Sequence, residues 1–113
     1  MDQERIIEKM MDFGLNKYEA KAYVALIKNP EVTAYELSKD SGVPQAKIYE
    51  TMSKLLSKNL VNIIGDSPTK YIPVDFDAFL DTYKENVEYS VDYLKKNIKN
   101  LSQSQKVSYL WHL

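Results

Sequence analysis

The 113-residue sequence contains no cysteine, one histidine and three glycines. Without cysteine the chain forms neither a disulfide scaffold nor a thiolate metal site. The single histidine, His112, excludes histidine clusters and the serine–histidine and cysteine–histidine pairs of hydrolases. There is no run of about 18 apolar residues, and the charged start MDQERIIEKM does not resemble a signal peptide. We therefore expect a cytoplasmic protein that is not an enzyme and has no cofactor, metal site or membrane segment.

Hydrophobic residues make up 44% of the chain and charged residues 27%, which is typical of a small globular domain. The net charge of −1 is unevenly distributed. Residues 37–71 carry five lysines and three acidic residues (+2), whereas residues 1–36 carry five basic and seven acidic residues (−2). The middle third is thus the one net-basic part, which is a weak indication of a polyanionic partner.

Two capping boxes mark helix starts in the first 40 residues. In a capping box, two side chains three positions apart accept hydrogen bonds from each other's backbone N–H groups. Asn16 with Glu19 fits this pattern, and Thr33 with Glu36 repeats it. The sequence therefore predicts helices that begin just after Asn16 and Thr33.

Residues that end helices divide the first 58 residues into four predicted helices. A first helix over residues 2–13 is broken by Gly14, and Pro30 ends the second because the residue before proline leaves the α region. Gly42 ends the third by supplying a left-handed conformation. The fourth helix is predicted over residues 44–58, with its proline near the first position, where a missing N–H has no consequence.

A β-hairpin follows these helices. The β-branched run at residues 60–64 is separated by the turn residues Gly-Asp-Ser-Pro (65–68) from a second run at residues 70–74. Pro73 confines the second strand to a sheet edge or places the proline near the strand's end.

A long helix is predicted over residues 75–106. Its apolar residues recur at steps of three and four, close to the 3.5-residue period of a coiled coil. We predict that two copies pair along this seam as a homodimer; the alternative is a hairpin onto the N-terminal helix. The seam consists of Leu80, Tyr83, Val87, Val91, Leu94, Ile98 and Leu101.

This order of elements predicts a mainly α-helical fold with a small β-hairpin. Residues 1–74 form a winged helix-turn-helix, and a long coiled-coil-like helix follows. A helix fits the major groove of DNA, and a hairpin beside it reaches phosphates or the minor groove. The side of helix 44–58 opposite its apolar residues is polar, short or cationic. The predicted DNA-contacting residues are Pro44, Gln45, Ala46, Lys47, Tyr49, Glu50 and Lys54 of this helix and Ser67, Thr69 and Lys70 of the wing.

Three stretches of the chain resemble the TrmB family of archaeal and bacterial transcription regulators. Residues 14–23 (GLNKYEAKAY) are similar to its first core helix, and residues 33–61, which include SGVP and KIYE, to its helix-turn-helix. The motif Pro68-x-Lys70-Tyr71 resembles part of the family's wing. Across roughly residues 5–75, the resemblance implies a sequence-specific transcription regulator whose partner is double-stranded DNA.

The chain departs from the family pattern in two places and differs from its larger members. Asn59 replaces a usual glycine, and Gln45-Ala46 stands where basic or hydroxyl residues are common. Larger members carry a C-terminal effector domain that binds sugars. The apolar residues 107–113 (VSYLWHL) are either the opening strand of such a domain or a tail that packs onto the helix. A sugar effector is expected only if a longer chain carries that domain.

A second function remains open at this point. The near-neutral charge and the single arginine, Arg5, are also compatible with a winged-helix module that binds other proteins of the transcription machinery. A solvated helix face would show the same polar pattern on a helical wheel.

Overall fold

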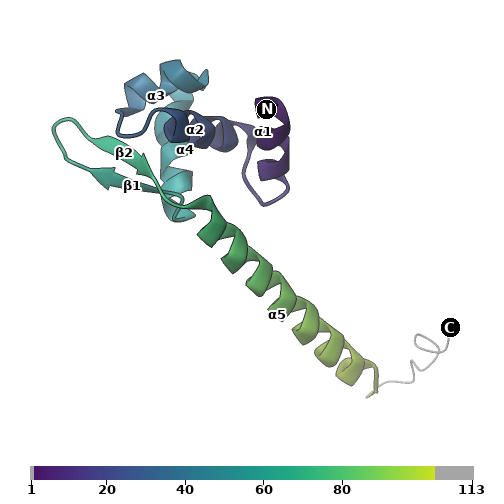
Figure 1. Ribbon diagram of the computed structural model, residues 1–113. Helices are drawn as coiled ribbons and strands as arrows, with labels where there is room; N and C mark the ends of the chain where they lie inside the picture. The colour runs from purple at the N-terminus through teal and green to yellow at the C-terminus, as the bar shows by residue number, and fades with distance from the viewer. Residues whose placement is uncertain (1, 104–113) are drawn as a thin grey trace. The chain divides into compact units, whose positions relative to one another are not determined.

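The computed structural model describes residues 2–103, whose elements follow the predicted order (Figure 1). Four helices come first: α1 (Gln3–Met11), α2 (Lys17–Lys28), α3 (Ala34–Ser41) and α4 (Gln45–Ser57). Strands β1 (Val61–Ile64) and β2 (Lys70–Pro73) follow, and α5 spans Phe76–Gln103. The predicted fold class, mainly α with a β-hairpin and a long C-terminal helix, is confirmed.

Both predicted capping boxes are present. The Asn16 side chain accepts a hydrogen bond from the Glu19 backbone N–H at 2.8 Å, and Glu19 Oε1 accepts one from the Asn16 N–H at 2.8 Å. Thr33 and Glu36 make the equivalent pair, with distances of 3.2 and 3.0 Å. Local sequence thus sets where α2 and α3 begin.

The ends of α4 differ by one residue from the prediction of 44–58. Pro44 is the N-cap rather than the first helical residue, because its ψ of 145° is extended while its carbonyl already accepts from Lys47 N at 2.8 Å. Lys58 is the C-cap with a ψ near zero, and Asn59 then takes a left-handed φ of +59°. Asn59 therefore reverses the chain as the usual glycine would.

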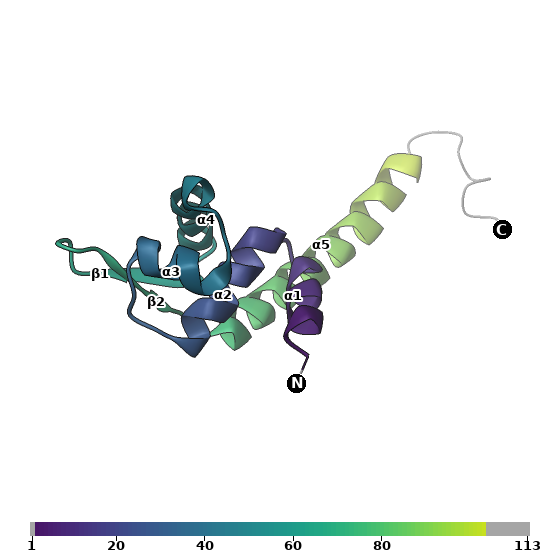
Figure 2. The same ribbon diagram turned by 90° about the horizontal axis from the view of Figure 1, so that it is seen from above.

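Helix α2 is the centre of the small core. It packs against α1, α3, α4 and β2, and it lies between α1 and α3 (Figure 2). Its Tyr23 and Leu26 are almost fully buried, as are Leu37 of α3 and Met52 of α4. This core holds α3 and α4 in a fixed arrangement.

The hairpin has the predicted antiparallel pairing, with Val61 opposite Pro73 and Ile64 opposite Lys70. On its other side, β2 makes a single bridge between Tyr71 and Val32. Pro73 is the last residue of β2, so the prediction that it lies near a strand end is confirmed.

The chain divides into two compact units, of which the first ends at Phe79 and the second begins at Leu80. The start of α5 belongs to the first unit. There the Tyr23 hydroxyl donates to the Val74 carbonyl, and the Tyr23 ring lies 5.2 Å from the Phe76 ring. Burial raises the pKa of Tyr23 to about 12, and the charges of Asp75 and Asp77 add to the effect. Tyr23 thus remains a neutral donor.

Every helix within residues 2–103 is too short or too polar to cross a lipid bilayer. The predicted tail at residues 107–113 and the last three residues of the predicted helix 75–106 lie outside the described residues.

Candidate nucleic-acid interface

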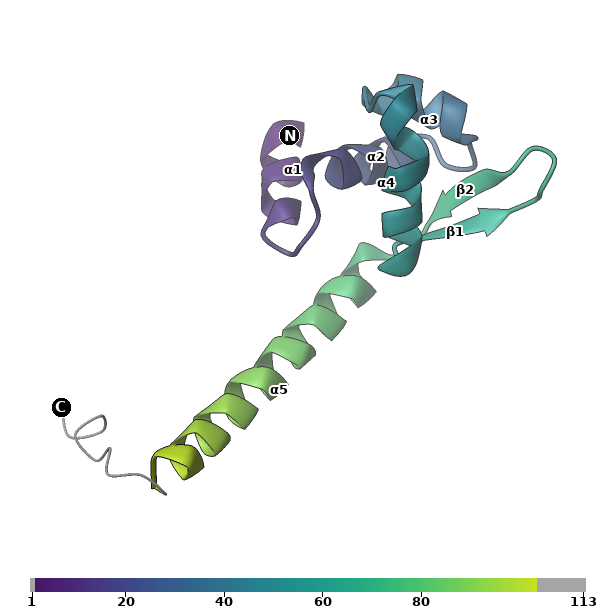
Figure 3. The ribbon, with the colours of Figure 1, turned by 180° about the vertical axis from the view of Figure 1, so that it is seen from behind.

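Helix α4 separates its side chains sharply into a buried and an exposed side. Ile48, Met52 and Leu55 are each at most 1% exposed and face α2 and α3. In the view from behind, no element lies in front of α4 (Figure 3). All seven residues predicted from the α4 sequence are exposed: Pro44, Gln45, Ala46, Lys47, Tyr49, Glu50 and Lys54.

The turn between α3 and α4 fixes how this face is presented. Gly42 has a φ of +80°, the left-handed conformation that the sequence predicts. The buried Ser38 hydroxyl donates to the Val43 carbonyl, and the Gly42 N–H donates to the Ser38 carbonyl at 3.0 Å. Val43 itself is 1% exposed, so the turn is anchored in the core.

The predicted wing residues cluster at the hairpin loop and the start of β2. Ser67 is exposed, whereas Thr69 and Lys70 are half-buried. Lys70 lies close enough to Glu36 of α3 to affect its ionisation. The Thr33 backbone N–H and hydroxyl, together with the positive charge of Lys70, hold the pKa of Glu36 below its ordinary value. The wing lysine thus has a carboxylate for a neighbour.

The lysines of α4 and of its C-cap differ in whether their charge is already paired with a carboxylate. Among residues 2–103, Lys47 and Lys54 form no ion pair, and both side chains are exposed. Lys58, by contrast, pairs with the buried Glu19 at 3.1 Å. Glu50 pairs with neither Lys47 nor Lys54 in the described part of the chain.

Tyr49 is the most exposed large hydrophobic side chain of α4, with 68% of its surface accessible. It lies near Tyr71 of β2, whose pKa is raised first by burial and then by the proximity of Tyr49. An exposed ring between α4 and the wing offers an apolar face and a hydroxyl at the same place.

Sequence reasoning missed two further exposed residues, Tyr35 and Lys39 of α3. The Lys39 ammonium lies 4.6 Å from the centroid of the Tyr35 ring. The available signal was their spacing of four residues on a helix, which places both side chains on one face.

The predicted seam of α5 is exposed along most of its length in the single chain. The accessible fraction of its aliphatic side chains is 46% at Val87, 52% at Leu94 and 46% at Ile98. Leu80 is half-buried, and Tyr83, Val91 and Leu101 are exposed. A stripe of this kind on a helix is typical of a coiled-coil face.

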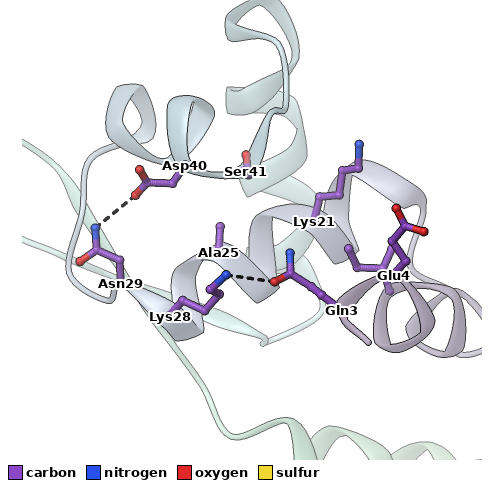
Figure 4. A pocket seen from close by; sticks show the side chains of 9 residues that line it. Gln3, Glu4, Lys21, Ala25, Lys28, Asn29, Asp40 and Ser41 are labelled. Atoms are coloured by element: carbon purple, nitrogen blue, oxygen red, sulfur yellow. Dashed lines mark hydrogen bonds between the residues drawn. The ribbon is translucent and has the colours of Figure 1, made fainter. Parts of the chain in front are cut away.

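A pocket of about 440 Å³ lies between α1, α2 and α3, and none of the predicted DNA-contacting residues lines it (Figure 4). Four of its polar groups are engaged with each other, because Lys28 donates to Gln3 at 3.0 Å and Asn29 donates to Asp40 at 3.1 Å. No group of three acidic or imidazole side chains within residues 2–103 could hold a metal ion.

Comparison with known proteins gives a consistent result. Residues 10–77 match the family described as "Sugar-specific transcriptional regulator TrmB". The chain is 36% identical over 101 residues to the HTH-type sugar sensing transcriptional regulator TrmBL1 of Pyrococcus furiosus, covering 89% of this chain and 30% of that protein. It is 31% identical over 111 residues to the DNA-binding HTH-type transcriptional repressor TrmBL2 of Thermococcus kodakarensis, covering 94% and 42%.

A solved structure of TrmBL2, described as an archaeal chromatin protein with a novel mode of DNA binding, superimposes with a TM-score of 0.81. The sequences are 27% identical, and the match covers 99% of this chain and 46% of that one. The chain thus spans less than half the length of these relatives.

Proposed function

This chain belongs to the TrmB family of transcriptional regulators, and we propose that it binds operator DNA as a homodimer. In this proposal α4 enters the major groove, and the β1–β2 wing contacts the backbone or the minor groove. Residues 1–74 are the DNA-binding domain, and residues 75–106 are the dimerisation helix. The chain is a transcriptional regulator with a winged-helix DNA-binding fold, and its family and relatives are regulators rather than enzymes.

One observation carries the proposal: the exposed side of α4 presents groups that suit base edges and phosphates. Gln45 can pair with adenine through two hydrogen bonds, and Ala46 can contact a thymine methyl group. Lys47 lies in the first turn and has no ion pair among the described residues, so its charge is available to guanine or phosphate. Glu50 can accept a hydrogen bond from cytosine.

The seam of α5 supports the dimer. A row of aliphatic side chains with about half of each surface in water is stabilised by pairing with a second copy of the same helix. In a dimer the two DNA-binding domains are linked. Once one domain is bound, the effective concentration of the second at its half-site is roughly millimolar. A two-fold dimer implies a pseudo-palindromic site with half-sites about one or two helical turns apart.

A sugar effector belongs to the proposal only for a longer chain with a further C-terminal domain. The family description and the name of the Pyrococcus relative both refer to sugar. The described residues supply the DNA-binding half of such a regulator.

The salt dependence of binding to duplex DNA tests the proposal. Binding is measured by fluorescence anisotropy with a labelled duplex of about 30 base pairs, which is long enough to contain two half-sites. For each half-site that the dimer occupies, Lys47→Ala and Lys70→Ala should each lower the salt slope by roughly 1. Gln45→Ala should instead change sequence preference, by about 1–3 kcal/mol at one base pair.

Lys96→Ala is the matched control, because Lys96 is an exposed lysine of α5 outside the proposed interface. Unchanged slopes for both Lys47→Ala and Lys70→Ala would refute this placement of DNA. Absence of binding by the unmodified protein at low salt would favour the protein-interaction module instead.

A further inference from the structure

Helix α3 carries an exposed tyrosine–lysine pair that the DNA-contacting set leaves out. Lys39 Nζ lies 4.6 Å from the centroid of the Tyr35 ring, and 51% of Tyr35 is accessible. The opposite side of the helix, with Ala34, Leu37 and Ser38, is buried in the core. The pair therefore adds nothing to the core and is presented to solvent.

The two ends of α3 are joined to the two parts of the proposed interface. Before its first turn, Val32 pairs with Tyr71 of the wing strand, and the Tyr71 N–H donates to the Val32 carbonyl at 2.8 Å. In the first turn, the positive charge of Lys70 contributes to the lowered pKa of Glu36. At the other end, the anchored turn at Gly42 leads directly into α4. We therefore expect a duplex that contacts both α4 and the wing to run beside α3.

The chemistry of the pair suits a phosphate group. Lys39 forms no ion pair within residues 2–103, so its charge is not neutralised by a carboxylate. The ring below holds the ammonium by a cation–π interaction and limits its rotamers before DNA arrives. The tyrosine hydroxyl adds a neutral hydrogen-bond donor, and hydroxyl and ammonium groups are common partners of phosphate oxygens.

We propose that Tyr35 and Lys39 together clamp a backbone phosphate of the bound duplex, next to the groove that α4 enters. This inference rests on the proposed function and adds a contact from a third element, α3. It concerns the sugar–phosphate backbone and not the bases, so the clamp acts on every DNA sequence.

Because the contact is independent of sequence, a random-sequence duplex of about 30 base pairs serves as the probe. Anisotropy titrations are run with the full chain over a series of salt concentrations. For each half-site that the dimer occupies, Lys39→Ala should lower the salt slope by about 1 and weaken binding roughly five- to tenfold near 0.1 M salt. Lys39→Arg should keep the slope. Tyr35→Phe should weaken binding about fivefold without changing the slope, because it removes only a neutral donor.

Matched controls come from α5, where Lys96 is exposed and Tyr89 is 70% exposed. Lys96→Ala and Tyr89→Phe should leave slope and affinity unchanged. Thermal melts of Lys39→Ala and Tyr35→Phe establish that both variants are folded.

The outcomes separate the clamp from the proposed function. If Lys47→Ala lowers the slope and Lys39→Ala does not, the clamp is wrong while α4 remains the reading helix. A lower melting temperature of Lys39→Ala with an unchanged slope would likewise reduce the pair to a helix-stabilising contact. If the unmodified chain fails to bind duplex DNA, both proposals fall.

Discussion

Lys58 at the end of α4 and Glu19 in the first turn of α2 form an ion pair, with Lys58 Nζ 3.1 Å from Glu19 Oε2. Glu19 is only 1% exposed, and its Oε1 also accepts the capping hydrogen bond from the Asn16 N–H at 2.8 Å. One carboxylate therefore caps α2 and tethers the C-terminal end of α4. The pair connects the base of the proposed reading helix to the centre of the core.

Replacing Lys58 by methionine should destabilise the fold by about 2 kcal/mol, because it leaves the buried Glu19 charge without its partner. The value lies below that of a fully buried pair, since the Lys58 side chain is 29% exposed. Urea denaturation measures the effect. Lys54→Met, one turn earlier and exposed, should change stability by less than about 0.5 kcal/mol. Equal effects of the two variants would contradict a structural role for the pair.

The elevated pKa of Tyr23 makes part of the stability depend on alkaline pH. In the folded chain its pKa is about 12, against about 10 for an ordinary tyrosine, so the folded state holds its proton more tightly. Its contribution is fully present below pH 10 and is lost as the pH rises towards 12. Denaturation at several pH values should therefore show the stability advantage over Tyr23→Phe falling by about 2 kcal/mol across this window. A constant advantage would show that the hydroxyl is not shielded.

Gly42 should resist substitution because of its backbone conformation and not because of crowding. Its φ is +80°, yet an added Cβ would meet no atom within 4 Å. Gly42→Val should therefore lower stability by about 1–2 kcal/mol or more, whereas Gly42→Asn should be milder. Asn59, at a φ of +59°, is an example of asparagine in this region within the same chain. Thermal melts that rank valine equal to asparagine would argue against this explanation.

Removing the carboxylate beside Lys70 should strengthen DNA binding. Glu36→Gln retains the side-chain acceptor for the Thr33 N–H but removes the negative charge near the wing lysine. We expect binding to a random-sequence duplex to tighten about two- to fivefold, as for an exposed charge pair. Glu88→Gln on α5, which is also exposed, should have no effect. Weaker binding by Glu36→Gln would indicate that the charge serves the helix cap alone.

The dimer prediction depends on the seam of α5. Leu94→Lys combined with Ile98→Lys should give monomers in sedimentation equilibrium, because two charges would enter an apolar helix pair. The variant should keep its helical circular dichroism and bind DNA far more weakly. Thr82→Lys with Tyr89→Lys adds the same charge on the opposite side of the helix and should remain dimeric. An unmodified protein that is monomeric at tens of micromolar would refute the dimer.

The positions of the helix starts and turns could be predicted because they depend on residues close together in the chain. Glu19 lies three positions after Asn16, and Glu36 three after Thr33, so each capping pair is visible in the sequence. Gly42 likewise meets a purely local demand for positive φ. The error of one residue at the start of α4 arose because a proline fits both the N-cap and the first helical position. The error at its end is the usual uncertainty of one residue between a last helical residue and a C-cap.

The candidate interface could be predicted in part. A helical wheel correctly identified the exposed side of α4, since one apolar stripe decides which side is buried. The wheel did not identify Tyr35 and Lys39 of α3 as candidates. They become candidates only because α3 lies close to the wing, and the bridge between Val32 and Tyr71 brings it there. That bridge joins residues 39 positions apart, and no local signal reveals it.

The sequence by itself determined the order of the elements, their capping and turn residues, and the side of each helix that is apolar, because these depend on spacings of a few residues. Only the tertiary structure decided that Lys58 pairs with Glu19 and that the charge of Lys70 contributes to the lowered pKa of Glu36. It also decided that the Tyr23 hydroxyl bonds to Val74, 51 positions away. The chain offers many lysines and carboxylates with similar local surroundings, and only the packing of the core brings Lys58 to within 3.1 Å of Glu19.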